Sequence, residues 1–166
     1  GVWAACLGVV NLANPVMLGI QNFLGPRIAA AYAESGEKGA GGFLARVSVL
    51  FAALIVPFTL VALAFGGSLV VLVYGGGYAG AGTVVGLLGV NLLVLALSFP
   101  VSRALFASGR AGLDCAVNGI ALAVLFIAGI RLVDTYGPAG AAMGLLAANS
   151  LSTVARAAIL IRVRSA

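Results

Sequence analysis

Amide side chains recur inside stretches of this chain that otherwise carry few polar groups. Four of them lie near the beginning, at Asn11, Asn14, Gln21 and Asn22. An α-helix would place these four near one face. Since an amide in hydrocarbon costs free energy unless it finds a partner or water, the pattern indicates the wall of a wet, substrate-binding cavity. Further candidates for that cavity are Asn91, Asn118 and Asn149.

An interhelical contact is the alternative for every amide: the side chain bonds to a neighbouring helix and contributes roughly 0.6–2 kcal/mol. We favour that contact for an isolated amide. We favour the cavity for the first group, because four amides on one stripe exceed what a helix contact needs. On this basis Asn11, Asn14 and Asn91 should face water, whereas Leu92 and Leu95 should not.

Three arginines stand at the ends of apolar stretches and are candidates for contact with an anionic lipid headgroup: Arg27, Arg103 and Arg110. A planar guanidinium matches the geometry of a phosphate. The competing interpretation is that these side chains only anchor the helices at the membrane surface.

Other chemistry is sparse in this sequence. The chain has no His and only four acidic residues, none of which we expect near the centre of a membrane span. No Gly-rich segment follows a strand and carries the lysine of a phosphate loop. We therefore expect no catalysis, no metal and no cofactor. Cys6 and Cys115 lie in apolar surroundings and should act as small hydrophobic side chains.

Long uncharged stretches must position these residues; they cover 1–26, 47–102, 115–130 and 135–155. Hydrophobic residues make up 63% of the chain and charged ones 8%, whereas soluble proteins average roughly half and a quarter. A helix needs about 20 apolar residues to cross a bilayer, so the second stretch is long enough for two spans. The predicted fold class is therefore all-α, a polytopic membrane helix bundle.

We predict a single transmembrane domain over residues 1–166. Its five spans should lie at about 3–24, 46–65, 82–102, 112–130 and 139–161.

Local signals add detail to these spans. Pro15 should kink the first one. Residues 34–42 should form a polar loop, and residues 66–80 an interfacial turn with Tyr74 and Tyr78 at headgroup depth. Small residues at every fourth position should let the last span pack closely against a neighbour; they are Gly140, Gly144, Ala148 and Ser152. Gly82 and Gly86 should act in the same way on the third span.

Basic residues gather at one side of the predicted membrane. That side carries Arg27, Lys38, Arg46, Arg103, Arg110, Arg156, Arg162 and Arg164, and the other carries only Arg131. The positive-inside rule then places the C-terminus in the cytoplasm. The net charge of +5 is explained by this topology, and we expect no nucleic-acid partner.

Four segments are similar, in order and spacing, to motifs of one known family. Residues 14–32 look like its helix leading into a cytoplasmic loop, and 74–81 like its outer-side G-x-x-Y-x-x-A turn. Residues 105–110 match an L-x-A-x-G-R helix end, and 136–142 a Y-G-x-x-G-A-A helix entry. The chain thus resembles the polysaccharide (O-antigen-type) flippase branch of the multidrug/oligosaccharidyl-lipid/polysaccharide (MOP) exporter superfamily.

This resemblance implies two six-helix lobes around a central cavity, with the five spans corresponding to helices eight to twelve. The chain begins with Gly1 inside an apolar run, so we expect it to be a fragment that lacks the N-terminal lobe. The implied function is to flip a lipid-linked oligosaccharide across the bacterial inner (plasma) membrane for polysaccharide or lipopolysaccharide biosynthesis. The implied partners are that substrate, the bilayer and the N-terminal lobe of the same chain.

Three alternatives remain open from the sequence. Two belong to the same superfamily: a multidrug cation antiporter and a lipid II flippase. The third is a membrane scaffold that transports nothing and packs through its small-residue ridges.

The predicted topology can be tested by cysteine labelling in a variant without the native cysteines. A cysteine at Gly76 should react with an impermeant thiol reagent added outside the cell, because this residue lies on the side with few basic residues. A cysteine at Lys38 should react only after permeabilisation. Reversed labelling would refute the five-span topology.

Overall fold

The computed structural model describes residues 1–165, apart from the side chains of Glu37, Lys38, Arg164 and Ser165. The described chain is helical and contains no strand. In order it forms α1 (Val2–Val10), η1 (Asn11–Ala13), α2 (Asn14–Gly39), α3 (Gly41–Tyr74), η2 (Gly76–Ala81), α4 (Gly82–Ala107), α5 (Ala111–Tyr136) and α6 (Pro138–Ser165).

Five helical segments are long and apolar enough to cross a membrane: Val2–Gly36, Gly41–Tyr74, Gly76–Ala107, Ala111–Tyr136 and Pro138–Val163. They correspond one to one with the five predicted spans, and every one is longer than predicted. The predicted all-α membrane helix bundle is confirmed.

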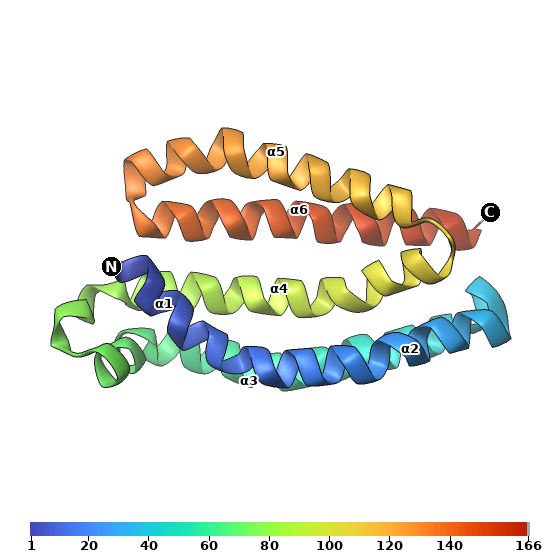
Figure 1. Ribbon diagram of the computed structural model, residues 1–166, viewed down its shortest axis with the longest axis horizontal. Coiled ribbons are helices and arrows are strands. Elements are labelled where there is room, and N and C mark those ends of the chain that lie inside the picture. Colours follow the sequence, from blue (N-terminus) through green and yellow to red (C-terminus); the bar gives the residue numbers. More distant parts are fainter. Residues whose placement is uncertain (166) are drawn as a thin grey trace.

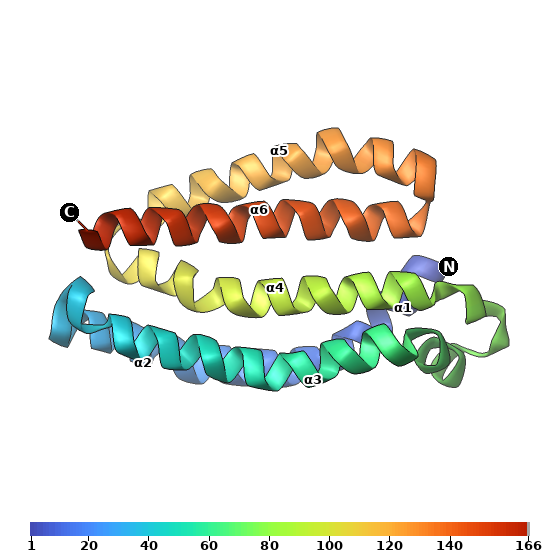
Figure 2. The same ribbon diagram turned by 180° about the vertical axis from the view of Figure 1, so that it is seen from behind.

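Helix α4 lies at the centre of this bundle. It runs between the α5–α6 hairpin and the α2 and α3 helices, with α6 nearer to it than α5 (Figure 1, Figure 2). Within its most apolar stretch 61% of the residues are buried, whereas the other four spans reach only 17 to 33%. Side chains of α4 are therefore the ones that neighbouring helices can meet from several directions.

The two ends of the bundle differ in what they contain. The α2–α3 turn, the α4–α5 turn and the end of α6 lie at one end of the bundle (Figure 1). The N-terminus, η2 and the α5–α6 turn lie at the other end (Figure 1).

A kink divides the first span, as predicted at Pro15. Helix α1 ends at Val10, a single 3-10 turn follows, and Pro15 occupies the first turn of α2. Proline is tolerated there because the amide hydrogen it lacks would have no helical acceptor. The bend lets α1 lean across the start of α4 (Figure 1), and the Cys6 thiol donates to the carbonyl oxygen of Ala81, the last residue of η2, at 3.8 Å. Both cysteines are free, with Cys6 buried and Cys115 exposed on α5.

The predicted polar loop at 34–42 is too long, although the chain does turn within it, at Gly36. Helix α2 continues to Gly39 and α3 starts at Gly41, with Ala40 alone between them. One residue reverses the chain direction: Gly36 has φ 67° and ψ −175°, a conformation that residues with a Cβ rarely adopt. Helical hydrogen bonding then resumes, since the amide of Ala40 donates to the carbonyl oxygen of Gly36 at 3.1 Å.

The predicted interfacial turn at 66–80 is also too long, because α3 runs on to Tyr74. The glycines that suggested a turn are a packing surface instead. A Cβ added to Gly66 would lie 2.8 Å from the carbonyl oxygen of Gly82, and one added to Gly82 would lie 2.9 Å from the amide nitrogen of Gly67. The turn itself is confined to Gly75 and η2, where the rings of Tyr74 and Tyr78 meet edge to face at 6.1 Å.

Small residues on α6 pack against α5, as the four-residue repeat predicts. A Cβ on Gly144 would lie 3.0 Å from the Cα of Gly129, and one on Gly140 would overlap the carbonyl group of Leu132. Gly86 of α4 approaches Leu63 of α3 in the same manner.

Because the α3–α4 contact is made through backbone atoms, Gly66→Ala should destabilise the protein by about 1–3 kcal/mol, the usual cost of overpacking a close contact. The thermal unfolding midpoint in detergent should fall. Gly19→Ala in α2 is the matched control, since nothing lies within 4 Å of the added methyl group. Equal midpoints for the two variants would contradict the close α3–α4 packing.

Candidate functional site

A hollow lined by both polar and apolar side chains lies between α2 and α4, and a side chain of α6 also lines it. Its volume is about 340 Å³. Helix α2 contributes Asn14 and Gln21, which are two helical turns apart and so share a face. Helix α4 contributes a polar stripe of the same kind, and α6 contributes Arg156. The polar residues from α4 are Ser98, Ser102 and Arg103.

A second hollow of about 440 Å³ adjoins the first and shares Gln21 and Arg103 with it. Asn22 lines only this second hollow, together with small and apolar residues of α2 and α4. We call the two hollows together the α2–α4 groove. No carboxylate is among the described residues that line it.

Two aromatic rings hold the exposed arginines near this region. The guanidinium carbon of Arg103 lies 5.2 Å from the ring centre of Phe99, which itself lines the groove. The guanidinium carbon of Arg27 lies 3.9 Å from the ring centre of Phe23 on the exposed side of α2. Stacking on an aromatic face fixes a guanidinium in place while leaving its edge available to an anion.

A buried ion pair joins α6 to α5 behind the groove. The Nε atom of Arg156 donates to Oδ1 of Asp114 at 2.7 Å, and the two side chains are only 9% and 5% exposed. Asn118, one turn further along α5, accepts from Nη2 of Arg156 at 2.6 Å and donates to Oδ2 of Asp114 at 3.2 Å. On the side of α4, Nη1 of Arg156 donates to Oγ of Ser98 at 2.6 Å.

The sequence analysis counted Arg156 among the basic residues on one side of the membrane and gave it no partner, whereas the structure buries its side chain against α4 and α5. Arg156 lies nine residues before the end of α6, roughly 14 Å at the helical rise. The signal that could have located it is its spacing from Ser152 and Asn149, which puts all three on one face of the helix. Facing residues Asp114 and Asn118 on the preceding span then supply its partners.

Asn91 and Asn149 do not line the groove. Nδ2 of Asn149 donates to Oδ1 of Asn91 at 2.7 Å, and Asn91 is buried between α4 and α6. This arrangement is the interhelical contact considered above, so Asn91 does not face water as the cavity interpretation required. Leu92 and Leu95, which should both have faced away from water, both line the groove, although Leu92 is largely buried.

The remaining predicted site residues are divided between the groove and its surroundings. Asn14, Gln21, Asn22 and Arg103 are brought together in the groove. Asn11 is exposed and accepts a hydrogen bond from Asn14 at 3.0 Å. Asn118 belongs to the Arg156 ion-pair cluster. Arg27 and Arg110 are not among the residues that line the groove; Arg110 lies at the N-terminus of α5.

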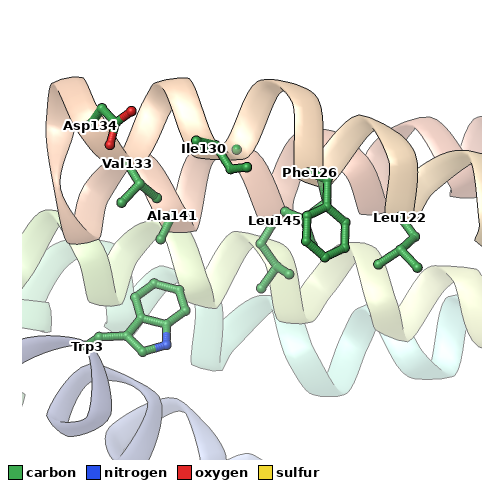
Figure 3. Close-up of a pocket in the computed structure, with 10 residues that line it drawn as sticks. Trp3, Leu122, Phe126, Ile130, Val133, Asp134, Ala141 and Leu145 are labelled. Carbon is green, nitrogen blue, oxygen red and sulfur yellow. The ribbon is translucent and has the colours of Figure 1, made fainter.

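An apolar hollow of about 500 Å³ lies toward the other end of the bundle. Figure 3 shows the ring of Trp3 reaching from α1 toward the α5–α6 hairpin, with Phe126 and Leu145 farther along the same wall. Among the described residues that line it, Asp134 is the one ionisable side chain. Such a surface suits hydrocarbon, so it offers a polar headgroup little to bind.

Comparison of the chain with protein-family models, with curated proteins and with solved structures finds no match.

The groove predicts a pattern of cysteine accessibility in a variant that lacks Cys6 and Cys115. A cysteine replacing Gln21 should react quickly with a small, polar, charged thiol reagent in membrane vesicles, because Gln21 lines both hollows. A cysteine replacing Asn91 should react at least about tenfold more slowly, because opening of the packed helices must come first. Equal protection at the two positions would mean that the groove is dry.

Proposed function

We propose that this chain is part of a transporter that flips a lipid-linked oligosaccharide across the bacterial inner membrane for polysaccharide biosynthesis. The α2–α4 groove carries the proposal. It combines amides of α2, hydroxyls of α4 and the guanidinium groups of Arg103 and Arg156 inside a bundle of membrane-spanning helices.

A phosphate-linked sugar headgroup needs such a surface because it cannot cross hydrocarbon unaided. Amides and hydroxyls replace water around sugar hydroxyls, and a guanidinium compensates the phosphate charge with paired hydrogen bonds. With no carboxylate among its described lining residues, the groove favours an anion. The two hollows, at about 340 and 440 Å³, are each within the usual size of small-molecule sites.

The resemblance of the four sequence segments to the polysaccharide flippases supports the same proposal. The gathering of basic residues at one end supports a cytoplasmic C-terminus under the positive-inside rule. In this orientation the groove's Arg103 lies toward the cytoplasmic mouth, where the substrate would be loaded.

Cation antiport has less support. An antiporter needs a carboxylate that exchanges protons or cations inside the membrane. Asp114 is the one buried carboxylate among the described side chains, and it is engaged by Arg156 and Asn118. An occupied carboxylate of this kind is poorly suited to bind and release a transported cation.

The test uses the full-length chain in a strain whose surface polysaccharide depends on it. Arg103→Ala should lower surface polysaccharide by roughly tenfold, because a charge-assisted contact of about 1.5–3 kcal/mol is lost. Arg103→Lys should retain part of the activity, since it keeps the charge but not the planar fork. Immunoblots of the membrane fraction should show unchanged protein.

Arg27→Ala is the matched control, because Arg27 carries the same charge and stacks on a ring but is not among the residues lining the groove. Its polysaccharide level should stay near that of the wild type. Normal export by Arg103→Ala would exclude the groove as the substrate path. Drug efflux with unaltered polysaccharide would refute the flippase proposal itself.

A further inference from the structure

A role in stabilising the fold does not by itself explain the position of Arg156. Its guanidinium is held by side chains from α4 and α5 and by Ser152 of its own helix, at 3.5 Å. It is nevertheless one of the residues that line the α2–α4 groove, as is its partner Ser98. A buried cation that reaches a polar cavity inside a membrane bundle is a candidate functional group.

Stability alone is a weak reason for this ion pair. Moving an arginine and an aspartate out of water costs several kcal/mol per ion, and an apolar pair of similar volume often gives equal or greater stability. The helices α5 and α6 already pack closely through Gly129, Gly140 and Gly144. This packing attracts the two helices to each other independently of the ion pair.

Only one of the two charged side chains of this ion pair lines the groove. Arg156 lines it, whereas Asp114 lies behind the guanidinium and is not a lining residue. Arg103 adds a second guanidinium to the same wall. Two cations and one screened carboxylate leave an excess positive charge facing the hollow, which attracts an anion.

We propose that Arg156 contacts the phosphate group of the ligand bound in the α2–α4 groove, and that Asp114 and Asn118 position its guanidinium for this contact. This inference rests on the proposed function. Asp114 holds Nε and Asn118 holds Nη2, both from the α5 side. Nη1 points to Ser98 on the groove wall, and a phosphate oxygen entering the hollow would accept from this nitrogen in place of the serine hydroxyl.

The experiment measures binding of radiolabelled polyprenyl phosphate to the full-length protein in phosphatidylcholine nanodiscs, together with the thermal unfolding midpoint. Arg156→Gln should weaken binding by roughly tenfold or more. The double variant Asp114→Arg with Arg156→Asp keeps an ion pair but turns a carboxylate toward the groove. It should bind as weakly as Arg156→Gln while unfolding near the wild-type midpoint.

A structural role gives the opposite result: the charge-swapped variant would recover both stability and binding, and this would overturn the proposal. If the swapped protein does not insert, Arg156→Lys decides the question. Lysine keeps the charge facing Asp114, so the midpoint should stay close to that of the wild type, but binding should fall severalfold because the fork is lost. Wild-type binding by Arg156→Lys and Arg156→Gln would also overturn the proposal.

Asn118→Leu tests the positioning role. This position is exposed on α5, so leucine suits the lipid, and the loss of the hydrogen bonds to Arg156 and Asp114 should lower the unfolding midpoint only moderately. Binding should nevertheless weaken severalfold, because Nη2 of Arg156 loses its acceptor. A lower midpoint with unchanged binding would show that Asn118 only supports the fold. Arg27→Ala, which should bind normally, is the control for general loss of positive charge.

Competition with inorganic phosphate identifies the source of the phosphate group. Displacement of the lipid by inorganic phosphate at comparable concentration would mean that the site takes the free anion, and weak displacement would mean that it takes the lipid headgroup. Both results support a phosphate contact at Arg156, whereas no saturable binding of either probe would refute it. Wild-type binding without any polysaccharide export would refute the proposed function and leave this contact standing.

Discussion

Hydrocarbon offers no hydrogen-bond partners, and this constraint explains the length of the helices and the pairing of polar side chains between them. Every backbone amide within a span must bond inside its own helix, so helices run on wherever the sequence allows it. This is why α3 passes through Gly66 and Gly67 and reaches Tyr74. The same constraint pairs Asn91 with Asn149, since an unpaired amide between α4 and α6 would be costly.

Close packing of small residues decides which helices meet, and thereby where the groove lies. Gly66 and Gly82 let α3 and α4 approach until backbone atoms nearly touch, and Gly144 does the same for α6 against Gly129 of α5. Van der Waals contact of this kind is the main attraction between helices in a bilayer. Side chains of α2 cannot approach α4 so closely, because Met17 and Phe99 stand between the two helices. The α2–α4 groove occupies that wider spacing.

The arginine side chains of the bundle are stabilised in two different ways. Arg27 and Arg103 lie against the rings of Phe23 and Phe99, with their charged ends accessible. Arg156 instead receives a carboxylate, an amide and a hydroxyl from two neighbouring helices. The first of these suits residues at the membrane surface. The second keeps a guanidinium oriented beside the groove, which is the arrangement an anion-binding site requires.

The sequence by itself determined the all-α membrane bundle, the number of spans, the kink at Pro15 and the gathering of basic residues at one end. These features follow from local composition and helical periodicity, which require only neighbours along the chain. The tertiary structure alone decided which polar residues share a site. Arg156 meets Asp114 across 42 residues, and Asn149 meets Asn91 across 58. Such pairs depend on the lateral order and rotation of the helices, which are set by the fit of small residues between spans, and periodicity within one span carries no information about that fit.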